Sequence, residues 1–254
     1  MRPSTEQTIK AAWAQLLGVS ELGSAERMVL VRDQAETVSF VRIFGQGVLT
    51  GPQWALDRAR NLRDDELALL PVLMRLASDH GARPLGAAEL SYTDERVEHA
   101  DLPVTESSAA VVALEAACSP EDVDEVGLGS MSHHWVLLDG HQSASDGSAE
   151  AARAGEADTS VTDDDADDQP VPLAGSGYTV WAGTIAHMGV LTSPAARGRG
   201  YGLLASAVGT NAALDAGLVP QWRARWDNET SKHLARVLGY EQVGTQTTVF
   251  IEPE

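Results

Sequence analysis

The chain has 254 residues and a formal net charge of −19, from 37 acidic and 18 basic side chains. This charge argues against nucleic acids and anionic membranes as partners, because both need a basic face. A single cysteine, Cys118, excludes an intrachain disulfide and a cysteine-rich zinc site, so we expect a cytoplasmic protein with a structural thiol.

Hydrophobic periodicity predicts regular elements along the first half of the chain. They are a helix at 5–18, strands at 27–33 and 37–45, a helix from about Pro52, a helix at 64–81 and a strand at 84–94. A short polar turn separates the first two strands, which predicts that they pair as a hairpin. Pro71 predicts a kink or a break in its helix. Residues 107–118 fit either a strand or a helix.

The second half is easier to assign. We expect a helix at 119–127 with Ser119 as its N-cap, strands at 134–140 and 177–192, a helix at 201–217, a strand at 218–227, a helix at 228–239 and a strand at 240–252. Asn228 can cap the last helix. The N-terminus lacks the apolar region of a signal peptide, and no apolar run is long enough to span a bilayer.

Residues 141–177 form an acidic insertion where a hairpin turn is expected between two strands. Its one basic residue is Arg153, and it has no aromatic side chain. Such a segment cannot bury enough apolar surface to offset its ordering entropy, which predicts disorder. The cluster at 163–168 lacks the turn glycine and closing glutamate of a calcium loop, so we interpret it as a solvated acidic loop and expect no metal.

The stretch VLTSPAARGRGYG, at 190–202, places two arginines and three glycines between a strand and a helix. The first turn of a helix has free backbone N–H groups and the positive end of the helix dipole. Glycines there let a bulky anion approach the main chain, which predicts a phosphate site. The alternative is an ordinary glycine-rich surface loop. The spacing fits neither a P-loop nor a dinucleotide fingerprint.

The spacing R-x-x-G-x-G, carried by Arg197, Gly200 and Gly202, resembles the acetyl-CoA motif of the GNAT superfamily of N-acetyltransferases. A second resemblance follows in the expected order, with Asn228, Ser231 and the sequence Leu-Gly-Tyr at 238–240. The resemblance covers about the last 135 residues. It implies an α/β (α+β) fold with a mixed, splayed sheet flanked by helices. We divide the chain into 1–110, an N-terminal extension or degenerate GNAT-like half, and 111–254, the GNAT core.

The resemblance also implies how acetyl-CoA binds and reacts. The diphosphate lies on the N–H groups of 198–202, the pantetheine arm pairs with the strand at 190–192, and an amine attacks the thioester directly. The implied cofactor-binding residues are Val190, Leu191, Thr192, Arg197, Gly198, Arg199, Gly200, Tyr201, Gly202 and Asn228. His187 is the candidate general base, because its intrinsic pKa suits the role. The alternatives are a packed strand histidine, or an acid from the first half as the base.

One position departs from the family pattern. Ala235 stands where many relatives have the tyrosine that protonates the leaving thiolate. Ser231, water or no acid at all are the remaining options. We therefore expect an N-acetyltransferase acting on a small-molecule or peptide amine, with a non-catalytic acyl-CoA-binding module and a protein-modifying acetyltransferase as alternatives. The acidic composition weakly favours cationic acceptors, and a homodimer is possible.

Overall fold

One ten-stranded mixed sheet forms the centre of the protein, whose computed structural model describes residues 1–24, 26–101, 103–139 and 170–252. The strands are β1 (Met28–Val31), β2 (Thr37–Ile43), β3 (Gln46–Gly51), β4 (Arg83–Tyr92), β5 (Val104–Thr105), β6 (His133–Leu138), β7 (Pro172–Trp181), β8 (Ile185–Thr192), β9 (Val219–Arg225) and β10 (Glu241–Phe250). Their order is β1-β3-β2-β10-β4-β9-β8-β7-β6-β5.

Helices cover both faces of this sheet. They are α1 (Pro3–Leu17), α2 (Gln53–Ala59), α3 (Asp64–Leu67), α4 (Leu70–Leu76), α5 (Ser108–Ala116), α6 (Pro120–Val126), α7 (Tyr201–Asp215) and α8 (Glu229–Val237). Short 3₁₀ turns follow α4 (Ser78–His80), α6 (Leu128–Ser130) and β8 (Pro194–Ala196). The fold class expected from the sequence, a mixed α/β sheet flanked by helices, is confirmed.

Alternating strand residues assign each helix to a face. Ile185 packs with Ile9 and Trp13 of α1, whereas its neighbour Ala186 packs with α7 and α8. Leu191, on the same face as Ile185, packs with α5 and the turn after α6. Thus α1, α5 and α6 cover one face, and α2, α4, α7 and α8 cover the other.

Strands from both halves of the chain alternate in the middle of the sheet. The last strand, β10, lies between β2 and β4 and pairs antiparallel with both. β4 in turn pairs with β9. The sheet is therefore continuous across residue 110, the predicted boundary between the two parts of the chain.

The predicted hairpin between the first two strands is wrong. β1 pairs in parallel with β3, and β2 forms its hairpin with β3 instead. Phe44 and Gly45 make that hairpin turn with positive φ angles of 46° and 85°. Consecutive strands usually pair, but the two-residue turn at Phe44 and Gly45 makes β2 and β3 the closer partners.

Two further segments differ from the predictions. The stretch 177–192 is not one strand, because Ala182 and Gly183, with φ of 48° and 71°, turn the chain between β7 and β8. The helix expected over 64–81 is broken into α3, α4 and a 3₁₀ turn, with Pro71 in the first turn of α4. The ambiguous segment at 107–118 is the helix α5.

The acidic insertion is shorter than predicted. Residues 172–177 belong to β7, which pairs with β6. Residues 141–169 of the predicted insertion, with its acidic cluster, lie outside the described residues. β6 and β7 are antiparallel neighbours, so this segment does connect the two strands of a hairpin, as the sequence indicates.

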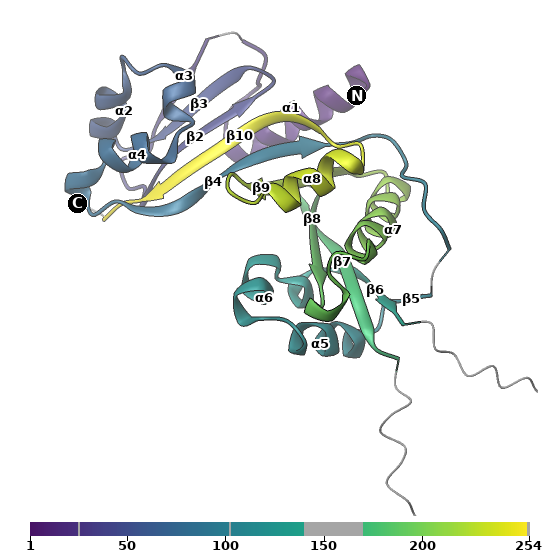
Figure 1. Cartoon of the computed structure of the whole chain (residues 1–254). Coiled ribbons are helices and arrows are strands. Elements are labelled where there is room, and N and C mark those ends of the chain that lie inside the picture. Colours follow the sequence, from purple (N-terminus) through teal and green to yellow (C-terminus); the bar gives the residue numbers. More distant parts are fainter. Residues whose placement is uncertain (25, 102, 140–169, 253–254) are drawn as a thin grey trace, which may run out of the picture.

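The sheet splays between β8 and β9. These two parallel strands pair only over Ile185–His187 and Val219–Gln221. Beyond that point β8 and β7 run away from β4 and β10, as Figure 1 shows. The splay leaves one edge of β8 without a strand partner from Met188 onward.

Candidate functional site

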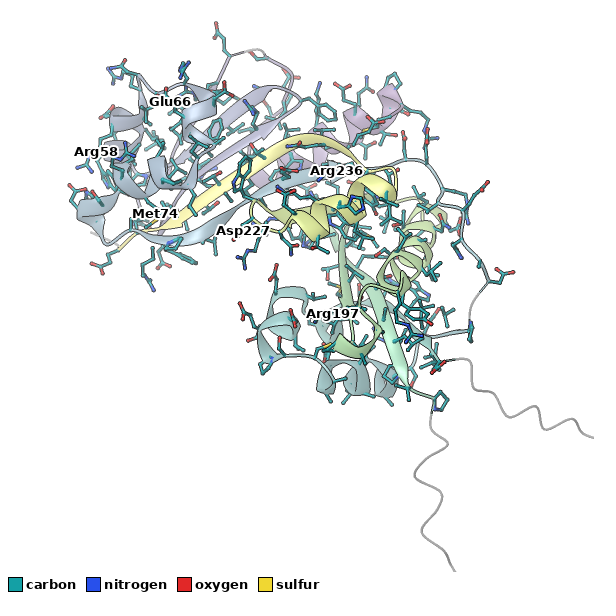
Figure 2. All side chains as sticks on the ribbon, in the orientation of Figure 1. Arg58, Glu66, Met74, Arg197, Asp227 and Arg236 are labelled. Carbon is teal, nitrogen blue, oxygen red and sulfur yellow. The ribbon has the colours of Figure 1, made fainter. Side chains whose placement is uncertain are left out.

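A cleft of about 1240 Å³ opens where β8 and β9 stop pairing. Its described lining comes from β8, the turn after it, the start of α7, β9, α8, α6, the start of β4 and the junction of α3 and α4. Arg197 and Asp227, both lining residues, lie on the two sides of this opening in Figure 2. The splay and the cleft are therefore one feature.

The turn between β8 and α7 has the geometry of an anion cradle. Gly198 and Gly200 have φ angles of 71° and 85°, and a Cβ at either would meet nothing within 4 Å. Gly200 is the N-cap of α7 and provides no side-chain cap, so the first N–H groups of the helix face the cleft without a side-chain partner from the cap. A Cβ on Gly202 would come within 2.8 Å of the Thr192 hydroxyl, which keeps α7 close to the end of β8.

Nearly all predicted cofactor residues line this cleft. They are Val190, Leu191, Thr192, Arg197, Gly198, Gly200, Tyr201, Gly202 and Asn228, together with the catalytic candidates His187 and Ser231. Arg199 is the exception. Its guanidinium lies over the Tyr201 ring, 5.1 Å from the ring centroid.

Arg197 is held by the protein itself. Its Nε donates to the carbonyl of Thr192 at 3.2 Å, and a terminal nitrogen donates to Asp122 of α6 at 3.0 Å. The Ser119 hydroxyl and Arg197 together lower the pKa of Asp122. Asp122 was not predicted as a site residue, because nothing local in the sequence links it to a turn 75 residues away.

Asn228 and Ser231 are tied to each other and to β9. The Asn228 side chain accepts from the Ser231 N–H at 2.9 Å, which confirms the predicted cap. The Ser231 hydroxyl accepts from the Trp222 indole at 3.0 Å and keeps its own proton available. Ala235 is buried in the core beneath α8, so it leaves no polar group at the position expected of a general acid.

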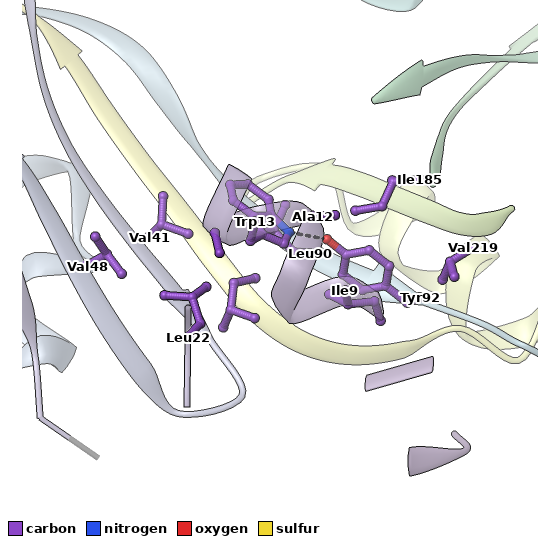
Figure 3. Packing of buried hydrophobic residues seen from close by; sticks show 12 residues of the cluster. Ile9, Ala12, Trp13, Leu22, Val41, Val48, Leu90, Tyr92, Ile185 and Val219 are labelled. Atoms are coloured by element: carbon purple, nitrogen blue, oxygen red, sulfur yellow. Dashed lines mark hydrogen bonds between the residues drawn. The ribbon is translucent and has the colours of Figure 1, made fainter. Parts of the chain in front are cut away.

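His187 is held at the point where β8 and β9 separate. Its ring stacks on Trp181 with 4.0 Å between centroids, and its Nδ1 lies 2.9 Å from Oε1 of Gln221. The Gln221 amide nitrogen donates to the Tyr92 hydroxyl, which also accepts from the Trp13 indole at 2.6 Å. Figure 3 shows the Trp13–Tyr92 hydrogen bond inside the buried cluster that α1 shares with the sheet.

This buried chain of hydrogen bonds favours one tautomer of His187. Because the Gln221 amide nitrogen is used by Tyr92, its oxygen faces the imidazole and accepts from Nδ1–H. The lone pair is then on Nε2. Burial lowers the pKa of His187, and the Arg223 charge lowers it further, against the opposing effect of the Gln221 hydrogen bond. A neutral ring with a free Nε2 is suited to accept a proton.

The cleft contains charged residues that the sequence did not identify. Arg225 contacts Asp227 at 2.9 Å and Glu125 of α6 at 3.6 Å, which connects the two sides of the splay. Arg223 is half-buried, and burial lowers its pKa. Strand alternation could have placed both arginines on one face, but which face meets the cleft depends on the pairing of β9 with β4 and β8.

The described residues contain no group of three or more histidine, cysteine, aspartate or glutamate side chains that could hold a metal ion. Within the same residues no helix has the length and apolar character needed to cross a bilayer.

Comparison with known proteins bears on the second half of the chain. Residues 166–249 match the family model described as GNAT acetyltransferase. Among curated proteins, none matches the sequence significantly.

Solved structures give distant likenesses. They include a GNAT-family acetyltransferase from Colwellia psychrerythraea (12% identity, TM-score 0.44, 70% of this chain and 61% of that one), a GCN5-related N-acetyltransferase from Kribbella flavida (19%, 0.41, 71% and 64%) and a GCN5-related N-acetyltransferase from Sphaerobacter thermophilus (14%, 0.43, 70% and 55%). The chain thus spans 55% to 64% of the length of these three proteins.

Proposed function

We propose that the chain is a member of the GNAT superfamily and that it transfers the acetyl group of acetyl-CoA to a primary amine; the family-model match over residues 166–249 supports this proposal. The observation that carries this proposal is the open helix start at Gly198–Gly202 beside the unpaired edge of β8. Backbone N–H groups and a helix dipole at the mouth of a cleft suit a diphosphate.

The residues present fit two parts of coenzyme A, its diphosphate and its pantetheine arm. The cradle residues 198–202 would hold the diphosphate, because a side chain is absent where the anion must approach. The edge of β8 from Met188 to Thr192 lacks a strand partner and would pair with the amide-containing pantetheine arm. Bound there, acetyl-CoA supplies an activated acetyl thioester.

Residues of this chain would carry out the proton transfers of the reaction. An amine must lose a proton to become a nucleophile, and the candidate acceptor is Nε2 of neutral His187, the last β8 residue that pairs with β9. In the complete transfer a nitrogen–carbon bond forms and the carbon–sulfur bond breaks. The ammonium form of the amine loses one proton to become the nucleophile, and its nitrogen loses a second as the amide forms. The departing thiolate gains one proton, from water or from the Ser231 hydroxyl, and the net proton passes to solvent.

One observation favours a second candidate. Ala235 is buried and the described part of α8 has no tyrosine, so a dedicated proton donor from that helix is missing. A module that binds acyl-CoA without turning it over would tolerate this loss. A thiolate is nevertheless a good leaving group, so we favour the enzyme.

Two measurements on the full chain separate these candidates. Calorimetry should detect acetyl-CoA binding, and thiol release should rise when suitable amines from a panel are added. Binding without release for any amine would identify the non-catalytic module. Absence of binding would overturn both.

A further inference from the structure

Arg223 occupies an unusual position in the cleft. It lies two residues after Gln221 on β9, so both side chains project from the same face of the sheet. Gln221 is bonded to His187, so Arg223 lies beyond the candidate base, about 7 Å farther along the strand. The charge of Arg223 also lowers the pKa of His187.

Arg223 also differs from the other cleft arginines of the described chain. Arg197 is paired with Asp122, and Arg225 is paired with Asp227 and Glu125. Arg223 donates only from Nε to the Gln246 amide oxygen at 3.4 Å, and no described carboxylate lies within 4 Å of it. Arg223 lines the cleft, and its two terminal nitrogens have no anionic partner among the described residues.

This arrangement is costly for the free protein. A half-buried guanidinium loses hydration and regains little of it from a single long hydrogen bond. A ligand anion in the cleft would restore the lost interactions with two parallel hydrogen bonds, the fork geometry that suits a carboxylate. No second unpaired arginine lines the described cleft, which favours a single negative charge over a phosphate dianion.

We propose that Arg223 binds a carboxylate of the acceptor, so that the amine substrate is an amino acid or a similarly compact amino carboxylate. This inference rests on the proposed acetyltransferase function and names its substrate class. With the carboxylate on Arg223, the amine of a small molecule is directed back toward Nε2 of His187. A long cationic acceptor without an acid group would leave Arg223 unpaired and add a second positive charge beside it.

The test uses product-like ligands, because their binding does not depend on turnover. N-acetyl amino acids and the matching N-acetyl amino acid amides are titrated into the full chain by calorimetry in the presence of coenzyme A. We expect the carboxylate to bind about 10- to 100-fold more tightly than its amide, the range for a charge-assisted pair. Equal affinities, or no binding by any carboxylate in the series, would overturn the inference.

A pair of variants tests whether Arg223 causes the preference for the carboxylate over the amide. Arg223→Gln should bring the carboxylate-to-amide affinity ratio to near one while leaving coenzyme A affinity unchanged. Arg225→Gln, on the same strand and face but already paired with acids, should keep the ratio within about twofold of the wild type. An unchanged ratio in Arg223→Gln would contradict the inference.

Thiol release with free amino acids is measured in parallel. Selective binding without release would reject the proposed function but keep the anion site. Equal thiol release with amino acids and with amines that lack an acid group would support the proposed function but reject the carboxylate site at Arg223.

Discussion

At His187, burial and hydrogen bonding act on the same pKa in opposite directions, and burial prevails. The ring is therefore neutral in the pH range where a free histidine is still partly charged. Its buried supports, Gln221, Tyr92 and Trp13, come from three different elements. They leave Nε2 as the one ring nitrogen able to take a proton.

The first prediction concerns pH. Because the base must be neutral, kcat/KM should fall as pH drops through the pKa of His187, with a midpoint below 6.5. His187→Gln should lower kcat/KM at pH 7.5 by about 100-fold or more and abolish this acid limb. The profile of His99→Gln, an exposed histidine outside the cleft, should match the wild type. An acid limb that survives in His187→Gln would assign the base elsewhere.

His187 can be proposed as the base from the sequence, but the residues that hold its ring cannot be found there. Gln221 and Arg223 sit in an alternating strand that predicts two faces without saying what covers them. Their positions follow from the register of β9 with β8 and β4, and the pairing with β4 joins residues more than 100 positions apart. Tyr92 and Trp13 look like ordinary core residues, and only their hydrogen bonds link them to the cleft.

At the scale of elements, the β8–α7 turn was predictable because its chemistry is local. Glycine positions, a following helix and a preceding strand are all visible in one short stretch. The β7–β8 turn was missed because Ala182, a residue that rarely adopts positive φ, occupies a turn position normally signalled by asparagine or glycine. The pairing of β1 with β3 was missed because parallel partners depend on the whole sheet.

The second prediction tests the cradle as an element. Gly200→Ala places a Cβ in the open space before α7, at a φ of 85°, and should raise the Kd for acetyl-CoA at least tenfold. Gly217→Ala is the matched control at the other end of α7, with φ of 74° and the same open surroundings. Both should lose about 1 kcal/mol of stability from backbone strain, measured by denaturant unfolding.

Only the Gly200 variant should weaken cofactor binding in calorimetry. If both variants lost affinity equally, strain transmitted through α7 would explain the effect and the cradle would not be the binding site. If neither did, the diphosphate would bind elsewhere.

At the scale of the whole molecule, α1 connects the start of the chain to the face of the sheet that carries His187. Its Trp13 supports Tyr92, and its first turn is fastened to Asp94, just after β4. The Asp94 carboxylate accepts from the Arg2 N–H at 2.7 Å and from the Thr5 hydroxyl at 2.7 Å. Burial alone would raise the pKa of Asp94, but these hydrogen bonds and the Arg2 charge lower it to about 2.

The last prediction follows from this attachment. A carboxylate whose pKa falls from 3.8 to about 2 on folding stabilises the native state by about 2 kcal/mol at neutral pH. The stabilisation is complete above the unfolded-state pKa and is lost as pH falls through 3.8 toward 2. Asp94→Asn should therefore lower the free energy of unfolding by about 2 kcal/mol at pH 7, measured with urea, and by less at pH 3.

Asp79 provides the control, because its pKa is lowered by an ion pair on the exposed surface. Its pKa is also lowered to about 2, through the Arg58 side chain, but its carboxylate is 59% exposed on the surface. Solvent screens such a pair, so Asp79→Asn should change the unfolding free energy far less than Asp94→Asn. Equal losses in the two variants would mean that the α1 attachment adds nothing beyond a surface ion pair, and the fixed placement of Trp13 under the His187 site would need another cause.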